Sequence, residues 1–265
     1  MGKLLLVGCG KMGGAMLEGW LARGLGAADV VVAEPVEALR PKTPGLRALA
    51  ASAELRESPE IVVLAVKPQA MDEALGDLKR FADQGAVFLS IAAGKTLKYF
   101  AAHLGAAAKV VRAMPNTPAA VRRGITVATA APGVSAGEKK RCHQLLEAVG
   151  EVLWVDDESL MDPVTALSGS GPAYVFLLVE AMAAAGAKLG LEPAMAMQLA
   201  RATVSGSGAL LQQSSEPAAQ LRVNVTSPGG TTAEALKVLM GDDGIQQVFD
   251  KALAAAARRS KELAG

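Results

Sequence analysis

The chain has 265 residues, of which 51% are hydrophobic and 20% are charged, and Lys plus Arg total 27 against 26 acidic residues. This near-neutral balance gives no electrostatic footprint for nucleic acid or for an anionic membrane. The length and the hydrophobic content allow one large domain or two ordinary ones, and we expect two.

The cysteines and the N-terminus indicate the compartment. The only cysteines, Cys9 and Cys142, are far apart in sequence, which is neither a disulfide framework nor a metal-ligand spacing. We therefore expect two reduced thiols and no metal. A strand is expected from Lys3, which leaves no room for a signal segment ahead of it. A cytoplasmic protein is the expectation.

The first part of the chain alternates between strand and helix patterns. Short, continuously apolar runs are typical of parallel strands that are covered on both faces. They lie at 3–8, 29–34, 60–66, 86–92, 109–114 and 150–156, with helical patterns such as 13–24 and 71–83 between them. This order predicts a Rossmann-type, doubly wound parallel sheet over residues 1–158.

After residue 158 the strand signals stop. From Asp162 onward the chain is expected to form helices: one ending at Gly190, then 193–213, 231–240 and 242–264. The prediction is an all-α C-terminal domain over residues 159–265. Its most apolar stretch, 172–187, is shorter than the roughly 20 residues that cross a membrane and carries Glu180. We expect a subunit interface there.

A glycine-rich loop follows the first strand directly. Gly8-Cys9-Gly10-Lys11-Met12-Gly13 fits G-x-G-x-x-G at the start of a helix, where free amides and the helix dipole favour a pyrophosphate. The context favours a dinucleotide site over a structural glycine turn. The backbone of Lys11 belongs to this loop, whereas its ammonium is either a contact or a solvated tip.

An acidic residue ends the second strand. Glu34 is placed to accept a hydrogen bond from a ribose 2′-hydroxyl and to repel a 2′-phosphate, which favours NADH over NADPH. The alternative is that Glu34 turns outward, with Arg40 or Lys42 reaching a phosphate.

Punctuated segments follow the later strands, where ligands bind in open α/β sheets. They are AVKPQ (65–69), AAGKT (92–96) and AMPNTPA (113–119). Their polar groups include Lys67, Asn116 and Thr117. The alternative for the last segment is a rigid turn, since Met114 and Thr117 each precede a proline. Its place at a strand end favours a site.

Several segments together resemble the pyrroline-5-carboxylate reductase family. They are AVKPQ, RAMPNTPA, ALSGSGPAY (166–174) and above all VTSPGGTTAEAL (225–236), in the family's order and over nearly the whole chain. The resemblance implies an oxidoreductase of proline biosynthesis, an amino-acid biosynthesis pathway, that passes a hydride from NADPH or NADH to the imine carbon of 1-pyrroline-5-carboxylate and yields L-proline. It also implies a homo-oligomer with a helical dimerisation domain, often a decamer.

The resemblance implies two sets of site residues. The substrate set is Ser227, Gly229, Gly230, Thr231 and Thr232, with the Thr232 hydroxyl near the ring nitrogen as the catalytic group. The cofactor set is residues 8–13 with Glu34, Ala65, Val66, Lys67, Pro68, Ala92, Ala93 and Asn116. This chain departs from the family pattern at Lys11 and Gly13, and the segment around Glu216 matches it only loosely.

The residues of the second glycine turn fit this substrate. Gly229 and Gly230 can expose successive amides to a carboxylate at a helix N-terminus. Thr231 with Glu234 fits a capping box, which would assign Thr231 to the helix end and leave Thr232 for the imine nitrogen. The alternative is a capped helix start and nothing more.

Two other functions remain open at this stage. A 3-hydroxyacid dehydrogenase would need a lysine on the first long C-terminal helix, and no Lys or Arg occurs from Cys142 to Ala187. A non-catalytic dinucleotide-binding regulator would not need the second glycine turn. Ser168 and Ser170 are explained mostly by a helix start, and the alternative is that they line the cleft. His103 and His143 are expected to be packing or surface residues.

Overall fold

A computed structural model describes residues 3–264. The first part is built on one eight-stranded sheet in the order β3-β2-β1-β4-β5-β6-β7-β8. Every neighbouring pair is parallel except β6 and β7, which are antiparallel. The strands are β1 (Leu4–Val7), β2 (Val30–Ala33), β3 (Arg47–Leu49), β4 (Ile61–Leu64), β5 (Val87–Ser90), β6 (Lys109–Met114), β7 (Gly124–Ala130) and β8 (Gly150–Trp154).

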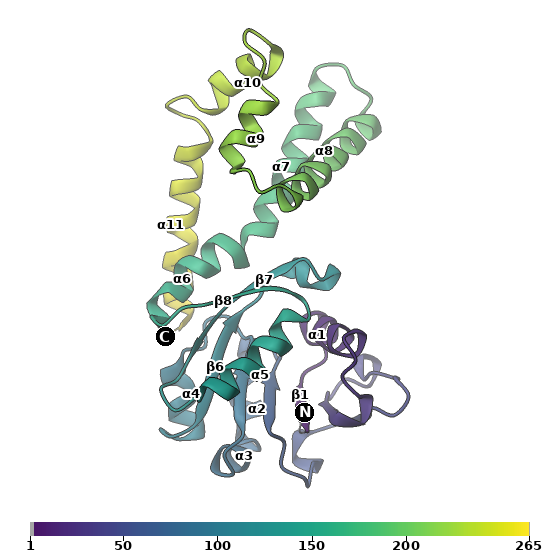
Figure 1. Cartoon of the computed structure of the whole chain (residues 1–265), viewed down its shortest axis with the longest axis vertical. Coiled ribbons are helices and arrows are strands. Elements are labelled where there is room, and N and C mark those ends of the chain that lie inside the picture. The colour runs from purple at the N-terminus through teal and green to yellow at the C-terminus, as the bar shows by residue number, and fades with distance from the viewer. Residues whose placement is uncertain (1–2, 265) are drawn as a thin grey trace. The chain divides into compact units, whose positions relative to one another are not determined.

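Helices cover both faces of this sheet (Figure 1). They are α1 (Lys11–Ala22), α2 (Met71–Gly76), α3 (Lys79–Asp83), α4 (Leu97–Leu104) and α5 (Ala136–Glu147). On one face, Trp20 of α1 and Leu145 of α5 pack against Leu4 and Leu6 of β1. On the other face, α2, α3 and α4 pack against side chains such as Leu5 of β1. The doubly wound architecture is thereby confirmed.

The structure differs from the predicted elements in a few places. β3 has only three residues and β7 alternates apolar residues with threonines, and neither was among the predicted strands. The predicted helix 71–83 is interrupted after Gly76, since Gly weakens a helix interior. The sheet is mostly parallel rather than wholly parallel. The connection 115–123 is too short for a crossover, so β7 runs antiparallel to β6.

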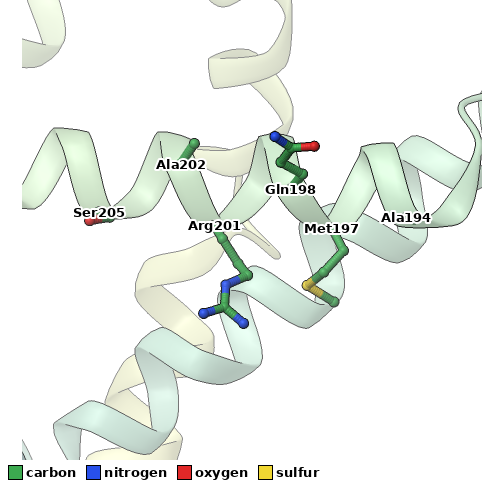
Figure 2. A pocket seen from close by; sticks show the side chains of 6 residues that line it. All are labelled: Ala194, Met197, Gln198, Arg201, Ala202 and Ser205. Atoms are coloured by element: carbon green, nitrogen blue, oxygen red, sulfur yellow. The ribbon is translucent and has the colours of Figure 1, made fainter.

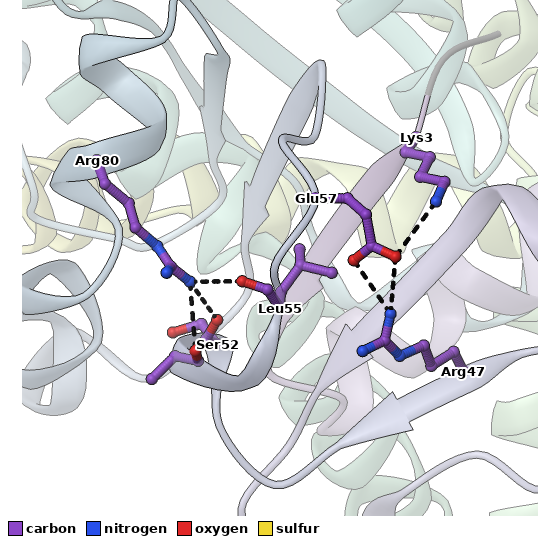
Figure 3. Close-up of polar contacts among 7 residues, drawn as sticks. Lys3, Arg47, Ser52, Leu55, Glu57 and Arg80 are labelled. Carbon is purple, nitrogen blue, oxygen red and sulfur yellow. Dashed lines mark hydrogen bonds and ion pairs between the residues drawn. The ribbon is translucent and has the colours of Figure 1, made fainter.

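Polar contacts hold the edge of the sheet near β3 (Figure 3). Glu57 pairs with Arg47 of β3 at 3.1 Å and with Lys3 at 3.6 Å. Arg80 of α3 donates to the carbonyl oxygens of Ser52 and Leu55 at 3.0 and 2.8 Å. These contacts fix the loop after the short strand, where few backbone hydrogen bonds are available.

The second part of the chain is helical throughout, as predicted. Its helices are α7 (Gly171–Lys188), α8 (Pro193–Gln213), α9 (Ala218–Asn224), α10 (Thr231–Leu239) and α11 (Ile245–Ala264). α9 was not predicted, because the segment around Pro217 lacks a long apolar period. The helices α7 and α8 pack on each other through Ala183, Ala196 and Ala200, which are buried.

The chain divides into two compact units. One contains residues up to Gly169 and again from Ala256 onward, and the other contains Ser170–Ala255. The short helix α6 (Met161–Val164) and the π-helical turn Thr165–Gly169 belong to the first unit, where Met161 and Ala166 are buried. The compact units thus divide later than the predicted boundary after residue 158, which as a division of function stays a prediction.

Candidate functional site

The first glycine loop has a different geometric requirement at each glycine. Gly8 has a φ of +90°, and a Cβ there would lie 2.8 Å from the carbonyl oxygen of Ala65. A Cβ at Gly13 would lie 2.3 Å from the carbonyl oxygen of Gly8. A Cβ at Gly10 would meet nothing within 4 Å. Two glycines therefore permit close packing, and the middle one borders open space that can admit a ligand.

The helix that follows this loop has an accessible N-terminus. α1 has 12 residues, its N-cap is Gly10, and no side chain caps its amides. Lys11 is exposed, whereas Met12 packs against the core. An uncapped helix start beside open space suits a pyrophosphate, since the amides and the helix dipole both favour an anion.

Glu34 turns inward and is 5% exposed. Its carboxylate accepts from the amide of Cys9 at 2.7 Å and from the amide of Val36 at 2.9 Å. The alternative that Glu34 faces outward is wrong. The sequence interpretation also missed that this carboxylate ties the end of β2 to the glycine loop, a contact signalled only by a buried acid at a strand end.

Of the two basic residues near Glu34, Arg40 is held by backbone carbonyl oxygens. Arg40 donates to the carbonyl oxygens of Glu34 and Pro35 at 2.8 and 3.0 Å, and Lys42 is exposed. A carboxylate has about four acceptor positions, so two amide bonds leave Glu34 able to accept from a hydroxyl.

The segments after β4, β5 and β6 follow neighbouring strands. Ala65 and Val66 are half-buried against Gly8, Pro68 begins a 3₁₀ turn, and Lys67 is exposed. Ala92 is buried and Ala93 is exposed. The structure thus brings the glycine loop, Glu34 and the 65–68 segment together.

Asn116 has a structural contact of its own. Its Oδ1 accepts from the amide of Ile125 at 3.0 Å, which closes the turn between β6 and β7. The rigid-turn interpretation of this segment therefore has support in the structure. A contact between Asn116 and a cofactor stays a prediction.

The second glycine turn precedes α10, in the second compact unit. Gly229 has a φ of +67°, and the amide of Gly230 donates to the carbonyl oxygen of Ser227 at 3.0 Å. The N-cap of α10 is Gly230, again without a side-chain cap. Thr231 is exposed and Thr232 is half-buried.

The predicted capping box at Thr231 is wrong. Thr231 is already the first helical residue, and Glu234 instead forms an ion pair with Lys237 at 2.6 Å. Because Gly230 occupies the cap position, no hydroxyl satisfies the first amides of α10. These amides therefore remain suited to an anion, as at α1.

Other candidates have structural explanations. Glu216 accepts from the side-chain amide of Asn224 at 3.1 Å, and Ser168 donates to the carbonyl oxygen of Val164 at 3.0 Å. His103 contacts Tyr99, and His143 accepts from the indole of Trp154 at 3.2 Å. Both cysteines are free and buried, and burial raises the pKa of Cys142 to about 12. Within residues 3–264, no acidic, His or Cys cluster could hold a metal ion.

A shallow hollow of about 510 Å³ lies along α8 (Figure 2). It is lined by Ala194, Met197, Gln198, Arg201, Ala202 and Ser205. None of the predicted site residues is among them. This hollow is therefore not the candidate catalytic site.

One helical stretch of the described chain, 158–188, is long and apolar enough to cross a membrane by length and composition. Within the chain its apolar side chains are largely uncovered, since Phe176 and Leu177 are each 62% exposed. The stretch 172–187 is thus not buried within a single copy of the chain.

The fold and the first glycine loop define a Rossmann-type dinucleotide-binding oxidoreductase, and comparisons with known proteins agree. Residues 3–94 match a family described as "NADP oxidoreductase coenzyme F420-dependent". Residues 158–263 match "Pyrroline-5-carboxylate reductase dimerisation". A pyrroline-5-carboxylate reductase from Pseudomonas aeruginosa is 40% identical, over 99% of this chain and 97% of its own length. The chain belongs to the pyrroline-5-carboxylate reductase family.

Solved structures give the same result. A pyrroline-5-carboxylate reductase from Coxiella burnetii superposes with a TM-score of 0.91 at 34% identity, covering 100% of this chain and 99% of that one. The reductase from Plasmodium falciparum, solved with NADP bound, gives a TM-score of 0.84 at 30% identity, with 99% and 98% coverage. The chain is thus a nicotinamide-dependent oxidoreductase that self-associates. Neither the dehydrogenase alternative nor the regulator alternative gains support.

Proposed function

We propose that this chain reduces the ring imine of 1-pyrroline-5-carboxylate to L-proline, with the substrate carboxylate held by the second glycine turn. The observation that carries the proposal is the start of α10. Gly229 is left-handed, Gly230 is the N-cap and no side chain satisfies the first amides of the helix. Ser227, Gly229, Gly230 and Thr231 would line the carboxylate site. The amide of Gly230 already donates to Ser227, so the N–H donors for the anion would come mainly from the uncapped first turn of α10.

The cofactor half of the proposal depends on the first glycine loop. Residues 8–13 would hold the pyrophosphate, Glu34 a ribose hydroxyl, and the segments at Ala65–Pro68, Ala92–Ala93 and Asn116 the rest of the dinucleotide. The open space at Gly10 and the uncapped start of α1 support this assignment. When bound, the nicotinamide supplies the hydride.

The protonation state of the entering imine decides whether the site must supply a proton to the ring nitrogen. If the imine enters protonated, hydride transfer to its carbon neutralises the iminium and no general acid is needed. If it enters neutral, its nitrogen takes a proton from the Thr232 hydroxyl or from water. Positioning should dominate in either case, since it can contribute roughly 7 to 11 kcal/mol, whereas a general acid typically contributes about 10² to 10⁴-fold.

Three finer proposals concern the cofactor preference, the oligomeric state and the location of the protein. Glu34 places a buried carboxylate at the end of β2, which favours NADH, because a 2′-phosphate would meet a like charge. The exposed apolar face of α7 supports a dimer, and a decamer built from such dimers is a further proposal. A cytoplasmic location is proposed with the biosynthetic role.

A direct assay of cofactor oxidation tests the function and the cofactor preference. The expected result is oxidation of NADH on adding 1-pyrroline-5-carboxylate, with a higher kcat/KM for NADH than for NADPH. In Glu34→Gln the ratio of these two values should fall, because the negative charge that opposes a 2′-phosphate is removed. No oxidation with either cofactor would contradict the function, and a preference for NADPH would contradict only the role of Glu34.

The variant Gly10→Ala tests the role of the cofactor loop. Its Cβ meets no protein atom within 4 Å and its φ of −69° suits alanine, so the fold should be retained. Dinucleotide affinity, measured by the fluorescence of the reduced cofactor, should fall because the methyl group occupies the open space. Unchanged affinity would show that the pyrophosphate binds elsewhere.

A further inference from the structure

Glu158 joins the start of α4, which follows β5, to the neighbouring strand β6. Its Oε1 accepts from the amide of Leu97 at 2.8 Å and from Nη1 of Arg112 at 2.7 Å. The Arg112 side chain is 5% exposed and that of Glu158 is 28% exposed. A buried guanidinium needs a partner, so this carboxylate is held firmly in place.

Both partners are next to segments assigned to the cofactor. Leu97 is the first residue of α4 and directly follows the 92–96 segment. Arg112 lies on β6, whose end leads into the segment that contains Asn116. β5 and β6 are neighbours in the sheet, with Ser90 opposite Arg112. One oxygen atom therefore links the end of the 92–96 segment to β6 near the carboxyl end of that strand.

The 92–96 segment is also held from other sides. Thr96 caps α4 by accepting from the amide of Tyr99 at 3.1 Å. Gly94 has a φ of +75°, and a Cβ there would lie 3.2 Å from the carbonyl oxygen of Leu263 in α11. The sheet pairs β5 with β6 before this segment begins, and Glu158 adds a side-chain contact that links the far end of the segment to β6.

We propose that Glu158 is a positioning residue, which sets the affinity for the nicotinamide dinucleotide by holding the 92–96 segment against the end of β6. This inference rests on the proposed function, in which both segments contact the dinucleotide. Glu158 is not itself placed against cofactor or substrate. Its effect is transmitted through the Leu97 amide and through Arg112.

A second ion pair on the same strand provides a matched control. Lys109, the first residue of β6, pairs with Glu138 at 2.8 Å, and the Glu138 side chain is 9% exposed. That pair ties β6 to the capped start of α5, at the other end of the strand from the cofactor segments. Loss of either acid should lower the thermal midpoint, but only loss of Glu158 should change dinucleotide binding.

The test is an equilibrium titration of the full-length chain with NADH, followed by the fluorescence of the reduced nicotinamide. Glu158→Ala should raise the Kd about tenfold, because the 92–96 segment would hold its binding-competent position in only about a tenth of the molecules, and the apparent affinity falls by that fraction. In Glu158→Gln the amide oxygen can still accept from Leu97, so part of the affinity should return. The KM for the imine should stay within about twofold in Glu158→Gln, and Glu138→Ala should bind NADH as the wild type does.

Two results would overturn the inference. One is a wild-type Kd in both Glu158 variants, which would leave the pair with a role in stability alone. The other is an equal loss of affinity in Glu138→Ala, which would make the effect a general one. If Glu158→Ala does not fold, Glu158→Gln decides by itself, because it preserves shape and removes only the charge. A wild-type chain that binds neither NADH nor NADPH would overturn the proposed function as well.

Discussion

Thr231 and Thr232, at the second glycine turn, have different roles because of the residue that caps α10. Gly230 occupies the N-cap of α10, so Thr231 begins the helix and its hydroxyl caps nothing. Thr231 is exposed and Thr232 is half-buried. The helix amides stay available to a carboxylate, and Thr232 keeps the role proposed for it at the imine nitrogen.

The variant Thr232→Ala tests that role. We expect a lower kcat with an unchanged Kd for NADH, and a loss smaller than about 10⁴-fold, because positioning persists without the hydroxyl. Thr232→Ser, which keeps a hydroxyl, should recover much of the activity. A loss beyond about 10⁴-fold in the alanine variant, with cofactor binding intact, would make Thr232 an obligatory acid.

At the scale of elements, the start of α5 shows how a strand and a helix are joined by charge. Ser135 and Glu138 form a reciprocal capping box, and Glu138 also pairs with Lys109 of β6. Burial opposes ionisation of Glu138, but the hydrogen bonds from Lys109 and Ser135 outweigh it and lower its pKa from 4.5 to about 2. The ionised carboxylate therefore stabilises the folded chain.

This pKa difference predicts a pH dependence of stability. Because the folded pKa is the lower one, the contribution is present above about pH 4.5 and is lost as the pH falls toward about 2. The free energy of unfolding, measured with urea, should fall by about 1–2 kcal/mol between pH 6 and pH 3 because of this group. The range allows for solvent screening at Lys109. Glu138→Gln should lose less over the same range. Equal losses in the two proteins would contradict the assignment.

At the scale of the whole molecule, the second compact unit leaves an apolar helix face uncovered. Phe176 and Leu177 of α7 and Leu199 of α8 are all more than half exposed. Large exposed apolar patches mark interaction surfaces, and this region matches the dimerisation family. A second copy of the chain would cover what the unit itself does not.

Phe176→Asp tests whether this face is the interface. The wild type should sediment as a dimer or a larger assembly, whereas the variant should shift toward monomer, because a carboxylate at a buried contact must be desolvated without a partner. Leu39→Asp, at a side chain 46% exposed in the first unit, should leave the assembly unchanged. An unaltered assembly in Phe176→Asp, or a folded wild-type monomer, would place the interface elsewhere.

Local sequence patterns determined most of the fold. The apolar runs at β1, β2, β4, β5, β6 and β8 and the long helices α7, α8, α10 and α11 were predictable, because burial on both faces or a helical period leaves a mark in the sequence itself. Strand β3 and helix α9 are too short to leave such a mark. The family was indicated by the resemblance of motifs such as VTSPGGTTAEAL to those of pyrroline-5-carboxylate reductases.

Contacts between distant residues were decided only by the tertiary structure. The inward turn of Glu34 onto the Cys9 amide depends on the spacing of β1 and β2, which no local pattern encodes. The pairing of Glu158 with Arg112 and Leu97 likewise needs three separate segments brought together. The sequence thus determines which residues can carry a charge or donate a hydrogen bond. Which of them meet is settled by packing, because each partner is chosen from residues far apart in the chain.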